Sequence, residues 1–215
     1  MINLQITPAN KPHIKYRNII FDLGKVLIQW NPEKFITDML KINKINEDES
    51  RNIFKAFGTK NWSDYDRGTT TQQELAKLYT SKKEKQYFLD FLEMLPSYLQ
   101  PIEQGVNWLN LAQTKGYKVY LLSNYPKDLY EKAASQYEFF NRIDGAVISY
   151  QVNKIKPEPE IYQTLLSKYD LKAEESIFID DLEENIRAGK LLGIDGIVCN
   201  DHNIVEKKLK ELSIF

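Results

Sequence analysis

Residues 19–30, IIFDLGKVLIQW, decide the fold of this chain. The run of Ile19, Ile20 and Phe21 has no polar interruption, which is typical of a strand buried on both faces. The run ends in a carboxylate, Asp22, so an ionisable group stands where the strand leaves the sheet. Two residues later, where a second acid would complete a catalytic pair of carboxylates, the chain has Gly24.

Four later runs have the same apolar character as the first. The five expected strands are Asn18–Asp22, Lys118–Ser123, Gly145–Ser149, Ser176–Asp180 and Gly196–Asn200. The helical segments between the later strands are Glu103–Lys115, Lys127–Tyr137, Glu160–Tyr169 and Glu183–Leu192. Strands that alternate with helices in this way form a parallel sheet. We therefore expect an α/β fold with a doubly wound, Rossmann-like parallel sheet and helices on both of its faces.

The interval from residue 31 to residue 100 breaks this alternation, because it contains no convincing strand. Its amphipathic stretches are Pro32–Ile42, Glu47–Phe57, Thr71–Thr80 and Lys83–Leu95. Thr71 and Glu74 have the spacing of a capping box, which marks a helix start. We therefore expect a catalytic core made of residues 1–30 and 101–215, with a helical domain of residues 31–100 inserted after the first strand.

The overall composition excludes several classes of protein. The chain has 215 residues, 42% apolar and 27% charged, and a formal net charge of −1, so no net field attracts nucleic acid or an anionic membrane. With Cys199 as its single cysteine the chain forms no internal disulfide, and neither histidine has the cysteine partners of a common zinc site. No apolar run approaches the ~18 residues of a membrane span. We expect a cytoplasmic monomer or homodimer.

Polar residues stand at the carboxyl ends of the predicted strands, where doubly wound sheets bind ligands. In chain order they are Asp22, then Ser123 and Asn124, then Lys154 and Lys156, then Asp180 and Asp181. Taken singly, each has an ordinary explanation as a helix cap, a turn residue or an exposed loop lysine. The adjacent acids Asp180 and Asp181 repel each other unless a cation compensates, and oxygen ligands near phosphate favour Mg²⁺. Their shared edge therefore predicts a catalytic site.

Four motifs carry a family resemblance. FDLGKVL (21–27), LLSN (121–124), KPEPEIY (156–162) and FIDDLEEN (178–185) resemble, in this order and spacing, the motifs of the haloacid dehalogenase-like hydrolase superfamily. The likeness covers residues 18–200, and the helical insert is similar to the superfamily's cap domain in its first insertion position. The glycine of FDLG resembles a subgroup that includes bacterial glucose-1-phosphate phosphatases. The phosphatase domains of soluble epoxide hydrolases are similar more distantly.

The resemblance implies a Mg²⁺-dependent phosphatase that acts on a small phosphate monoester, with a sugar phosphate as the expected substrate. The implied roles are a nucleophile that becomes an aspartyl-phosphate (Asp22), phosphoryl-group binding (the Ser123 hydroxyl and Asn124 backbone) and charge neutralisation (Lys156). The implied metal site uses Asp22, the Gly24 carbonyl, Asp181 directly and Asp180 through water, with Asn185 in support. Mg²⁺ and a lysine cancel the repulsion between a carboxylate and a phosphate dianion.

Three positions depart from the family pattern. Gly24 replaces the acid that protonates the leaving alcohol, a contribution typically worth ~10²–10⁴-fold in rate. Two explanations stay open: the leaving group is an acidic anomeric sugar oxygen, or the cap or solvent supplies the proton. Asn153 stands where a glycine is often found before the motif lysine. Lys25 stands where a small residue is frequent, and it either contacts substrate or faces solvent.

The insert contributes its own candidates in the stretch NWSDYDRGTTTQQEL, residues 61–75. Trp62, Tyr65 and Arg67 offer a stacking surface, a hydroxyl and a guanidinium fork that suits phosphate or hydroxyl groups. The alternative for Trp62 and Tyr65 is packing inside the insert. Trp30, after the first motif, is either hinge packing or a pocket wall.

Two other functions compete with the phosphatase hypothesis. A 2-haloacid dehalogenase also uses an aspartate nucleophile without the second acid, but it needs no metal, so the Asp180–Asp181 pair argues against it. A degenerate member of the superfamily would keep the fold as a binding protein. Against this, Asp22, Ser123 and Lys156 are all retained together with the acidic pair. No basic patch interleaved with aromatic residues suggests nucleic-acid binding.

Overall fold

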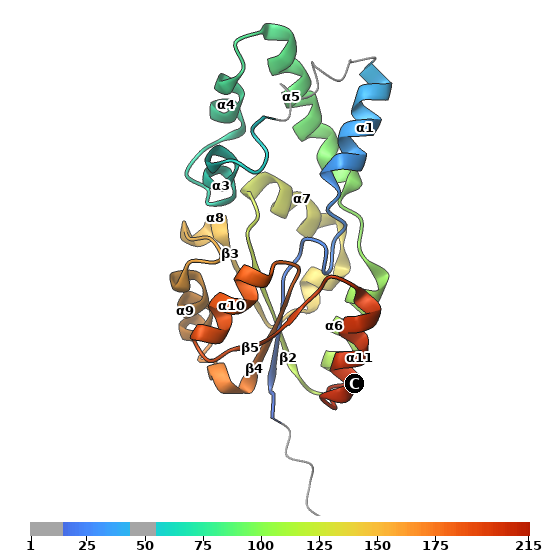
Figure 1. Cartoon of the computed structure of the whole chain (residues 1–215), viewed down its shortest axis with the longest axis vertical. Helices are drawn as coiled ribbons and strands as arrows, with labels where there is room; N and C mark the ends of the chain where they lie inside the picture. The colour runs from blue at the N-terminus through green and yellow to red at the C-terminus, as the bar shows by residue number, and fades with distance from the viewer. Residues whose placement is uncertain (1–14, 44–54) are drawn as a thin grey trace, which may run out of the picture.

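The computed structural model describes residues 15–43 and 55–215, and its centre is one parallel sheet (Figure 1). The strands are β1 (Asn18–Phe21), β2 (Lys118–Ser123), β3 (Gly145–Ile148), β4 (Ser176–Asp180) and β5 (Asp195–Val198). Their order is β3-β2-β1-β4-β5, so β1 is the central strand. Phe21 pairs with Leu121 of β2 on one side and with Ile179 of β4 on the other. This register brings the carboxyl ends of three strands to Asp22.

Helices cover both faces of the sheet, as expected. Successive residues of β1 point to opposite faces, so Ile19 and Phe21 join one buried cluster and Ile20 joins another. The first cluster includes side chains of α6 (Glu103–Thr114), α7 (Lys127–Gln136) and α11 (His202–Glu211). The second includes side chains of α9 (Pro159–Lys168) and α10 (Glu183–Leu191). The predicted α/β doubly wound fold is confirmed, although α11 was not anticipated.

The described elements from α1 to η2, which follow β1 in the chain, form the upper part of the molecule in Figure 1, beyond the carboxyl ends of the strands. These elements are α1 (Pro32–Asn43), α3 (Lys60–Asp66), α4 (Gln72–Leu75), η1 (Ala76–Leu78), α5 (Lys82–Met94) and η2 (Leu95–Tyr98). The capping box is confirmed, because Thr71 Oγ1 accepts from Glu74 N and Glu74 Oε2 accepts from Thr71 N. The expected helix 47–57 lies largely outside the described residues.

The remaining described elements are short: α8 (Ser149–Val152), η3 (Glu138–Arg142) and η4 (Ala173–Glu175). Helix α3 was not predicted because its seven residues span too few turns to show a clear apolar period. Within the described ranges, no helix has the length and apolar character needed to cross a membrane.

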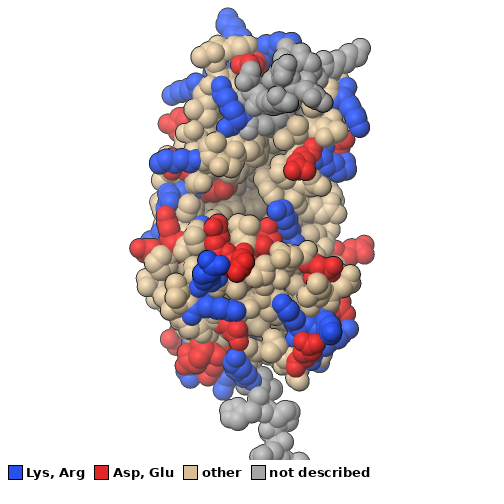
Figure 2. Space-filling model, viewed as in Figure 1, with Lys and Arg blue, Asp and Glu red and all other residues tan. Residues whose placement is uncertain are grey.

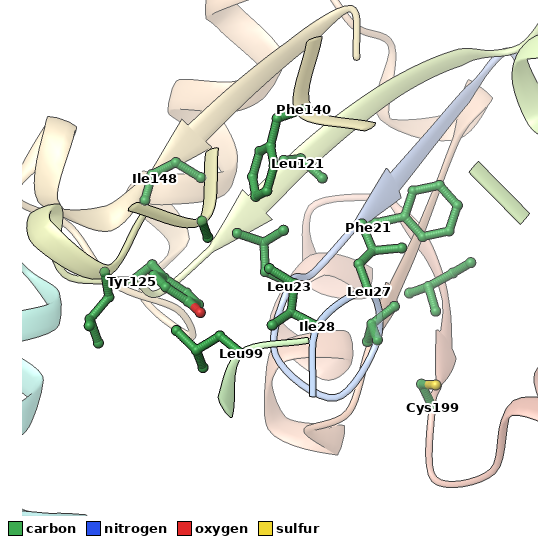
Figure 3. Close-up of a cluster of buried hydrophobic side chains, with 14 of the residues drawn as sticks. Phe21, Leu23, Leu27, Ile28, Leu99, Leu121, Tyr125, Phe140, Ile148 and Cys199 are labelled. Atoms are coloured by element: carbon green, nitrogen blue, oxygen red, sulfur yellow. The ribbon is translucent and has the colours of Figure 1, made fainter. Parts of the chain in front are cut away.

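A tight loop follows β1 and holds Asp22 and Gly24 in place. The Leu23 carbonyl accepts from Leu27 N at 2.9 Å and from Ile28 N at 2.8 Å. The side chains of Leu23, Leu27 and Ile28 are fully buried in the cluster shown in Figure 3. Apolar burial on the inner side of the loop therefore fixes the backbone that carries Asp22.

The loop and helix α6 approach each other so closely that only glycine fits at position 105. A Cβ at Gly105 would lie 2.1 Å from the Val26 carbonyl oxygen, which is backbone and has no rotamer to change. We expect Gly105→Ala to lower the free energy of unfolding by about 1–3 kcal/mol, because either α6 or the loop must move. A thermal unfolding experiment measures this loss as a decrease in melting temperature of roughly 2–4 °C per kcal/mol.

The matched control for Gly105→Ala is Gly189→Ala in α10. A Cβ at Gly189 would meet its nearest atom at 3.6 Å, an ordinary contact, and alanine favours the helix. This control should unfold at or above the wild-type temperature. Equal behaviour of the two variants would contradict the close approach of α6 to the loop.

Candidate active site

The ammonium group of Lys156 is the centre of the site. Its Nζ donates to Asp22 Oδ1 at 2.7 Å, to Asp180 Oδ2 at 2.6 Å and to the Leu122 carbonyl at 3.0 Å. These three bonds use all of its donors, and the lysine side chain is only 2% exposed. Residues from β2, from the segments following β1 and β3, and from β4 are thus joined at one buried point.

The charges of this cluster shift one another's pKa values. Burial alone would lower the pKa of Lys156, but the carboxylates of Asp180 and Asp22 overcome this and raise it above its ordinary value, so the lysine stays charged. Burial raises the pKa of Asp22 to about 6, and the charge of Asp180 adds to this. Lys156 and a hydrogen bond from Ser123 oppose the rise. Asp22 is therefore a desolvated carboxylate, and the positive charge of Lys156 favours its ionised form.

Asp180 is fully buried and fully occupied. Its Oδ1 accepts from Leu182 N at 2.8 Å, and the Asn185 side chain donates to both of its oxygens, at 3.0 and 3.1 Å. Together with the bond from Lys156, this saturates the carboxylate. Asp180 therefore orients Lys156 and Asn185.

Asn124 joins the second and third motifs directly. Its Oδ1 accepts from Lys156 N at 2.8 Å, and its Nδ2 donates to the Lys156 carbonyl at 2.9 Å. This reciprocal amide pair fixes the backbone on which the lysine is mounted. Ser123, the last residue of β2, is 1% exposed beside Asp22.

A pocket of about 410 Å³ opens above this cluster, between the sheet edge and the helical insert. The hollow at mid-height in Figure 2 lies between these two parts, with acidic side chains along its lower rim. One wall is aromatic: Phe57 stacks on Trp62 with centroids 4.0 Å apart, and Trp30 lies 6.3 Å from Trp62. The floor is polar and includes Asp22 and Asp181. Such a pocket suits a small molecule with an anionic end and a carbon skeleton.

The donor set at the pocket floor fits a divalent cation. Carboxylate oxygens of Asp22, Asp180 and Asp181 lie within 4.8 Å of one another. Burial, with the charge of Asp180, raises the pKa of Asp181, whose ion pair is with Lys25 at 3.2 Å. In addition, Asn185 Oδ1 is buried without a hydrogen-bond partner in the described structure. Hard oxygen donors with uncompensated negative charge are the environment that Mg²⁺ prefers.

The three candidate residues from the insert, Trp62, Tyr65 and Arg67, lie in two different places. One lines the pocket, and the other two contact the core. Trp62 lines the pocket and is also packed within the aromatic cluster. Tyr65 is buried and its hydroxyl donates to Asp128 at 3.0 Å. Arg67 forms a bidentate ion pair with Glu158, at 2.6 and 2.8 Å. Tyr65 and Arg67 are not among the pocket-lining residues, so the structure places them in the insert–core contact instead of the expected substrate contact.

The other two departures from the family pattern, Asn153 and Lys25, share an unusual backbone conformation. Asn153 has φ +53° and Lys25 has φ +56°, the left-handed region that glycine and asparagine adopt most easily. Asn153 also donates to the Arg67 carbonyl at 3.0 Å. The Lys25 side chain is 52% exposed, lines the pocket and pairs with Asp181, so it belongs to the site without being buried in it.

The sequence interpretation did not name two residues with polar side chains that line the pocket. Asp66 stands between Tyr65 and Arg67 in the insert, and Tyr125 follows Asn124 after β2. Tyr65 and Arg67 do not line the pocket, so only the backbone path shows that Asp66 is the residue of this stretch that does.

The fold and site define a class of α/β enzymes in which an aspartate at the end of the central strand faces a lysine and an acidic pair. A family model for haloacid dehalogenase-like hydrolases matches residues 16–193, and the chain belongs to this family of hydrolases.

Similar proteins include named phosphatases. The chain is 24% identical over 203 residues to a sesquiterpene phosphatase of Aspergillus oryzae, covering 92% of this chain and 96% of the relative. It is 26% identical over 194 residues to a D-ribitol-5-phosphate phosphatase of Bacteroides thetaiotaomicron, covering 83% and 89%. Among solved structures, a haloacid dehalogenase family enzyme from Bacteroides thetaiotaomicron in complex with magnesium and inorganic phosphate has a TM-score of 0.63 at 25% identity, covering 85% of this chain and 93% of that one.

The buried lysine generates a stability prediction. Lys156→Met leaves the carboxylates of Asp22 and Asp180 without their cation, so we expect a loss of about 3–5 kcal/mol at pH 8. In the variant Asp22 loses the cation that opposes the rise of its pKa, so the folded state binds more protons than the unfolded state and the deficit shrinks as the pH falls. Urea unfolding at pH 8 and pH 5 measures this.

Lys154→Met on the same loop is the control, because Lys154 donates to the Thr164 hydroxyl at 3.2 Å and pairs with no carboxylate of residues 15–43 or 55–215. It should unfold close to wild type at both pH values. If Lys156→Met did not lower the free energy of unfolding, or lowered it more at pH 5 than at pH 8, Lys156 would not be the cation that compensates the charges of Asp22 and Asp180.

Proposed function

We propose that this protein is a Mg²⁺-dependent phosphatase that hydrolyses a small phosphorylated metabolite, with a sugar phosphate as the substrate class, through an aspartyl-phosphate. One observation carries the proposal. The Asp22 carboxylate is held at the pocket floor by a buried, charged lysine, beside a second carboxylate, Asp181, that faces the pocket. A nucleophile, a cation and a metal-binding oxygen at one point are the parts that phosphoryl transfer requires.

Lys156 makes nucleophilic attack by Asp22 feasible. Its bond to Asp22 Oδ1 leaves Oδ2 as the attacking oxygen and orients the carboxylate plane. The ammonium charge also offsets the repulsion between Asp22 and a phosphate dianion. Ser123, hydrogen-bonded beside Asp22, and the Asn124 backbone supply further donors for the phosphoryl oxygens. Most of the catalytic effect expected here is therefore positioning and charge compensation.

The residues that would hold Mg²⁺ are Asp22, Asp181 and the carbonyl of Gly24, with Asp180 and Asn185 in support. Bound there, Mg²⁺ would supply positive charge to the phosphoryl oxygens. Glycine at position 24 retains the carbonyl that this site needs.

Residues 31–100 act as a cap over the core of residues 1–30 and 101–215. Support comes from the pocket, whose floor belongs to the core and whose aromatic wall includes Phe57 and Trp62 of the insert. The Arg67–Glu158 ion pair fastens the two parts at the rim. Closure of this kind excludes water and strengthens electrostatic interactions at the reacting centre.

The substrate class rests on the pocket and on the relatives. The aromatic wall offers flat faces to a carbon skeleton, while the charged floor accepts one phosphate. The D-ribitol-5-phosphate phosphatase and the sesquiterpene phosphatase are named for a polyol phosphate and a terpenoid substrate, so the panel for the test includes both kinds. The acidic pair argues against a metal-free dehalogenase.

The activity prediction concerns phosphate release. Wild-type protein with Mg²⁺ should release inorganic phosphate from a panel of sugar 1-phosphates, primary sugar and polyol phosphates, isoprenoid phosphates, nucleotides and 4-nitrophenyl phosphate. EDTA should abolish release. Asp22→Asn should also abolish it, because an amide is not a nucleophile toward phosphorus. Silence across the panel, combined with chloride release from 2-chloropropionate, would replace the phosphatase proposal with the dehalogenase.

The metal prediction concerns binding and needs no substrate. Mg²⁺ should raise the melting temperature of wild-type protein, since a ligand at 100 times its Kd stabilises by about 2.7 kcal/mol. Asp181→Asn should remove most of this rise by deleting a ligand. Glu183→Gln, an exposed acid paired with Arg187 nearby, is the control and should keep the wild-type response. Loss of the response in both variants would show non-specific screening instead of a site.

A further inference from the structure

The structure leaves one chemical requirement of the proposed function unassigned. An alcohol leaves phosphorus readily only if its oxygen receives a proton as the bond breaks, and the first motif offers no acid because Gly24 has no side chain. A Cβ at Gly24 would lie 3.9 Å from Asp22 Oδ2 and 3.9 Å from Trp30 Cβ, and Gly24 itself lines the pocket. A proton donor therefore has to come from another residue that lines the same pocket.

Most polar groups around the pocket are already engaged. Lys156 uses all three donors, and both ends of the Asn124 amide bind the Lys156 backbone. Lys25 is paired with Asp181, and the Asn185 amide nitrogen with Asp180. These contacts engage each of the groups within the catalytic cluster itself.

Asp66 is different. It is the last residue of α3, it lines the pocket, and its carboxylate has no hydrogen-bond or ion-pair partner among the described residues. The groups that face it electrostatically are Asp22 and Lys156 of the core, with Tyr65 and Tyr125 beside it. An acid from the insert thus lines the same pocket as the aspartate proposed to attack phosphorus.

The backbone at Asp66 is anchored to the core, so its position is defined. The buried hydroxyl of Ser149 donates to the Asp66 carbonyl and accepts from Tyr125 N at 2.8 Å. The guanidinium of the next residue, Arg67, forms a bidentate ion pair with Glu158. Gly68 follows with φ +76°, and a Cβ there would lie 3.0 Å from Tyr150. These contacts hold the end of α3 against the sheet edge with Asp66 directed to the pocket.

Tyr125 provides a second donor at the same place. Its hydroxyl is buried without a hydrogen-bond partner in the described structure, although the residue lines the pocket. Burial and the charges of Asp22 and Asp66 raise its pKa, so it keeps its proton. A buried hydroxyl without a partner beside the pocket indicates that a ligand atom normally satisfies it.

We propose that Asp66 is the general acid and base of the reaction, replacing the acid absent at Gly24, and that the Tyr125 hydroxyl binds the leaving oxygen beside it. The inference rests on the proposed phosphatase function and identifies the proton donor and acceptor that this function requires. Its consequence for the substrate is that the leaving group need not be an acidic anomeric oxygen. Primary alkyl phosphates are then substrates.

The proton balance closes over the two steps. Asp22 Oδ2 bonds to phosphorus while the bond to the leaving oxygen breaks, and that oxygen takes its electron pair and the proton of Asp66. Water then attacks the phosphorus of the aspartyl-phosphate, and the Asp22 oxygen leaves with its electron pair. The proton lost by the water goes to Asp66, which is restored. Burial, reinforced by the charge of Asp22, raises the pKa of Asp66 to about 8, which agrees with a protonated resting form.

The test compares leaving groups, because 4-nitrophenolate departs without a proton and a primary alkoxide does not. For Asp66→Asn we expect kcat/KM to fall ~10²-fold or more for a primary alkyl phosphate and to stay near wild type for 4-nitrophenyl phosphate. The same variant should show a burst of 4-nitrophenol, since the loss of the base slows hydrolysis of the aspartyl-phosphate. Tyr125→Phe, which deletes only a hydroxyl, should show a smaller loss with the same selectivity for alkyl substrates.

The controls separate this inference from the function on which it rests. Asp64→Asn, on the outer side of the same helix and paired with Lys60, should match wild type on both substrates. Asp22→Asn should abolish both activities, and a wild type inactive on both would refute the phosphatase function itself. With wild type active, equal losses on the two substrates in a folded Asp66→Asn variant, or no loss on either, would overturn the role of Asp66.

Discussion

The buried ammonium of Lys156 is the constraint on which the rest of the site depends. Two carboxylates, Asp22 after β1 and Asp180 at the end of β4, are buried side by side, and without a cation their mutual repulsion and desolvation would force protonation or movement. The lysine comes from a third segment, and its remaining donor bonds the β2 backbone. One ionic contact therefore fixes the relative positions of three strand ends, and the reciprocal amide pair of Asn124 fixes the lysine in turn.

This arrangement gives chemically similar acids different environments. Asp180 has every oxygen occupied and acts by orienting its neighbours. Asp22 has one oxygen held by Lys156, Asp181 meets only a half-exposed lysine, and Asp66 has no partner in the described structure. The partners of the carboxylates decrease from Asp180 through Asp22 and Asp181 to Asp66. The proposed roles follow the same order: positioning group, nucleophile, metal ligand and proton donor. Partners and burial separate the functions of groups whose intrinsic pKa values are nearly the same.

The insert completes the site through a few polar contacts with the core. Tyr65 with Asp128, the Asp66 backbone with Ser149, and Arg67 with Glu158 all lie within one turn of chain. Residues in the insert that looked suited to binding substrate are used for docking, and docking delivers the neighbouring acid to the pocket. One type of core can support different chemistry when the groups around its site differ. The groups that the insert brings to the pocket thus bear directly on which reaction the core can perform.

The sequence by itself determined the sheet, the helices on both faces and the shared edge of Asp22, Ser123, Lys156 and Asp181, because buried parallel strands read as continuous apolar runs and their carboxyl ends coincide by topology. It also indicated the capping box at Thr71 and the helical character of the insert. It could not show that Arg67 faces Glu158, that Asp66 faces the pocket, or that Lys25 and Asn153 need a left-handed backbone. The first two features depend on how the insert sits on the core, across contacts as far apart as Arg67 and Glu158 in the chain, and local periodicity carries no information about such pairings.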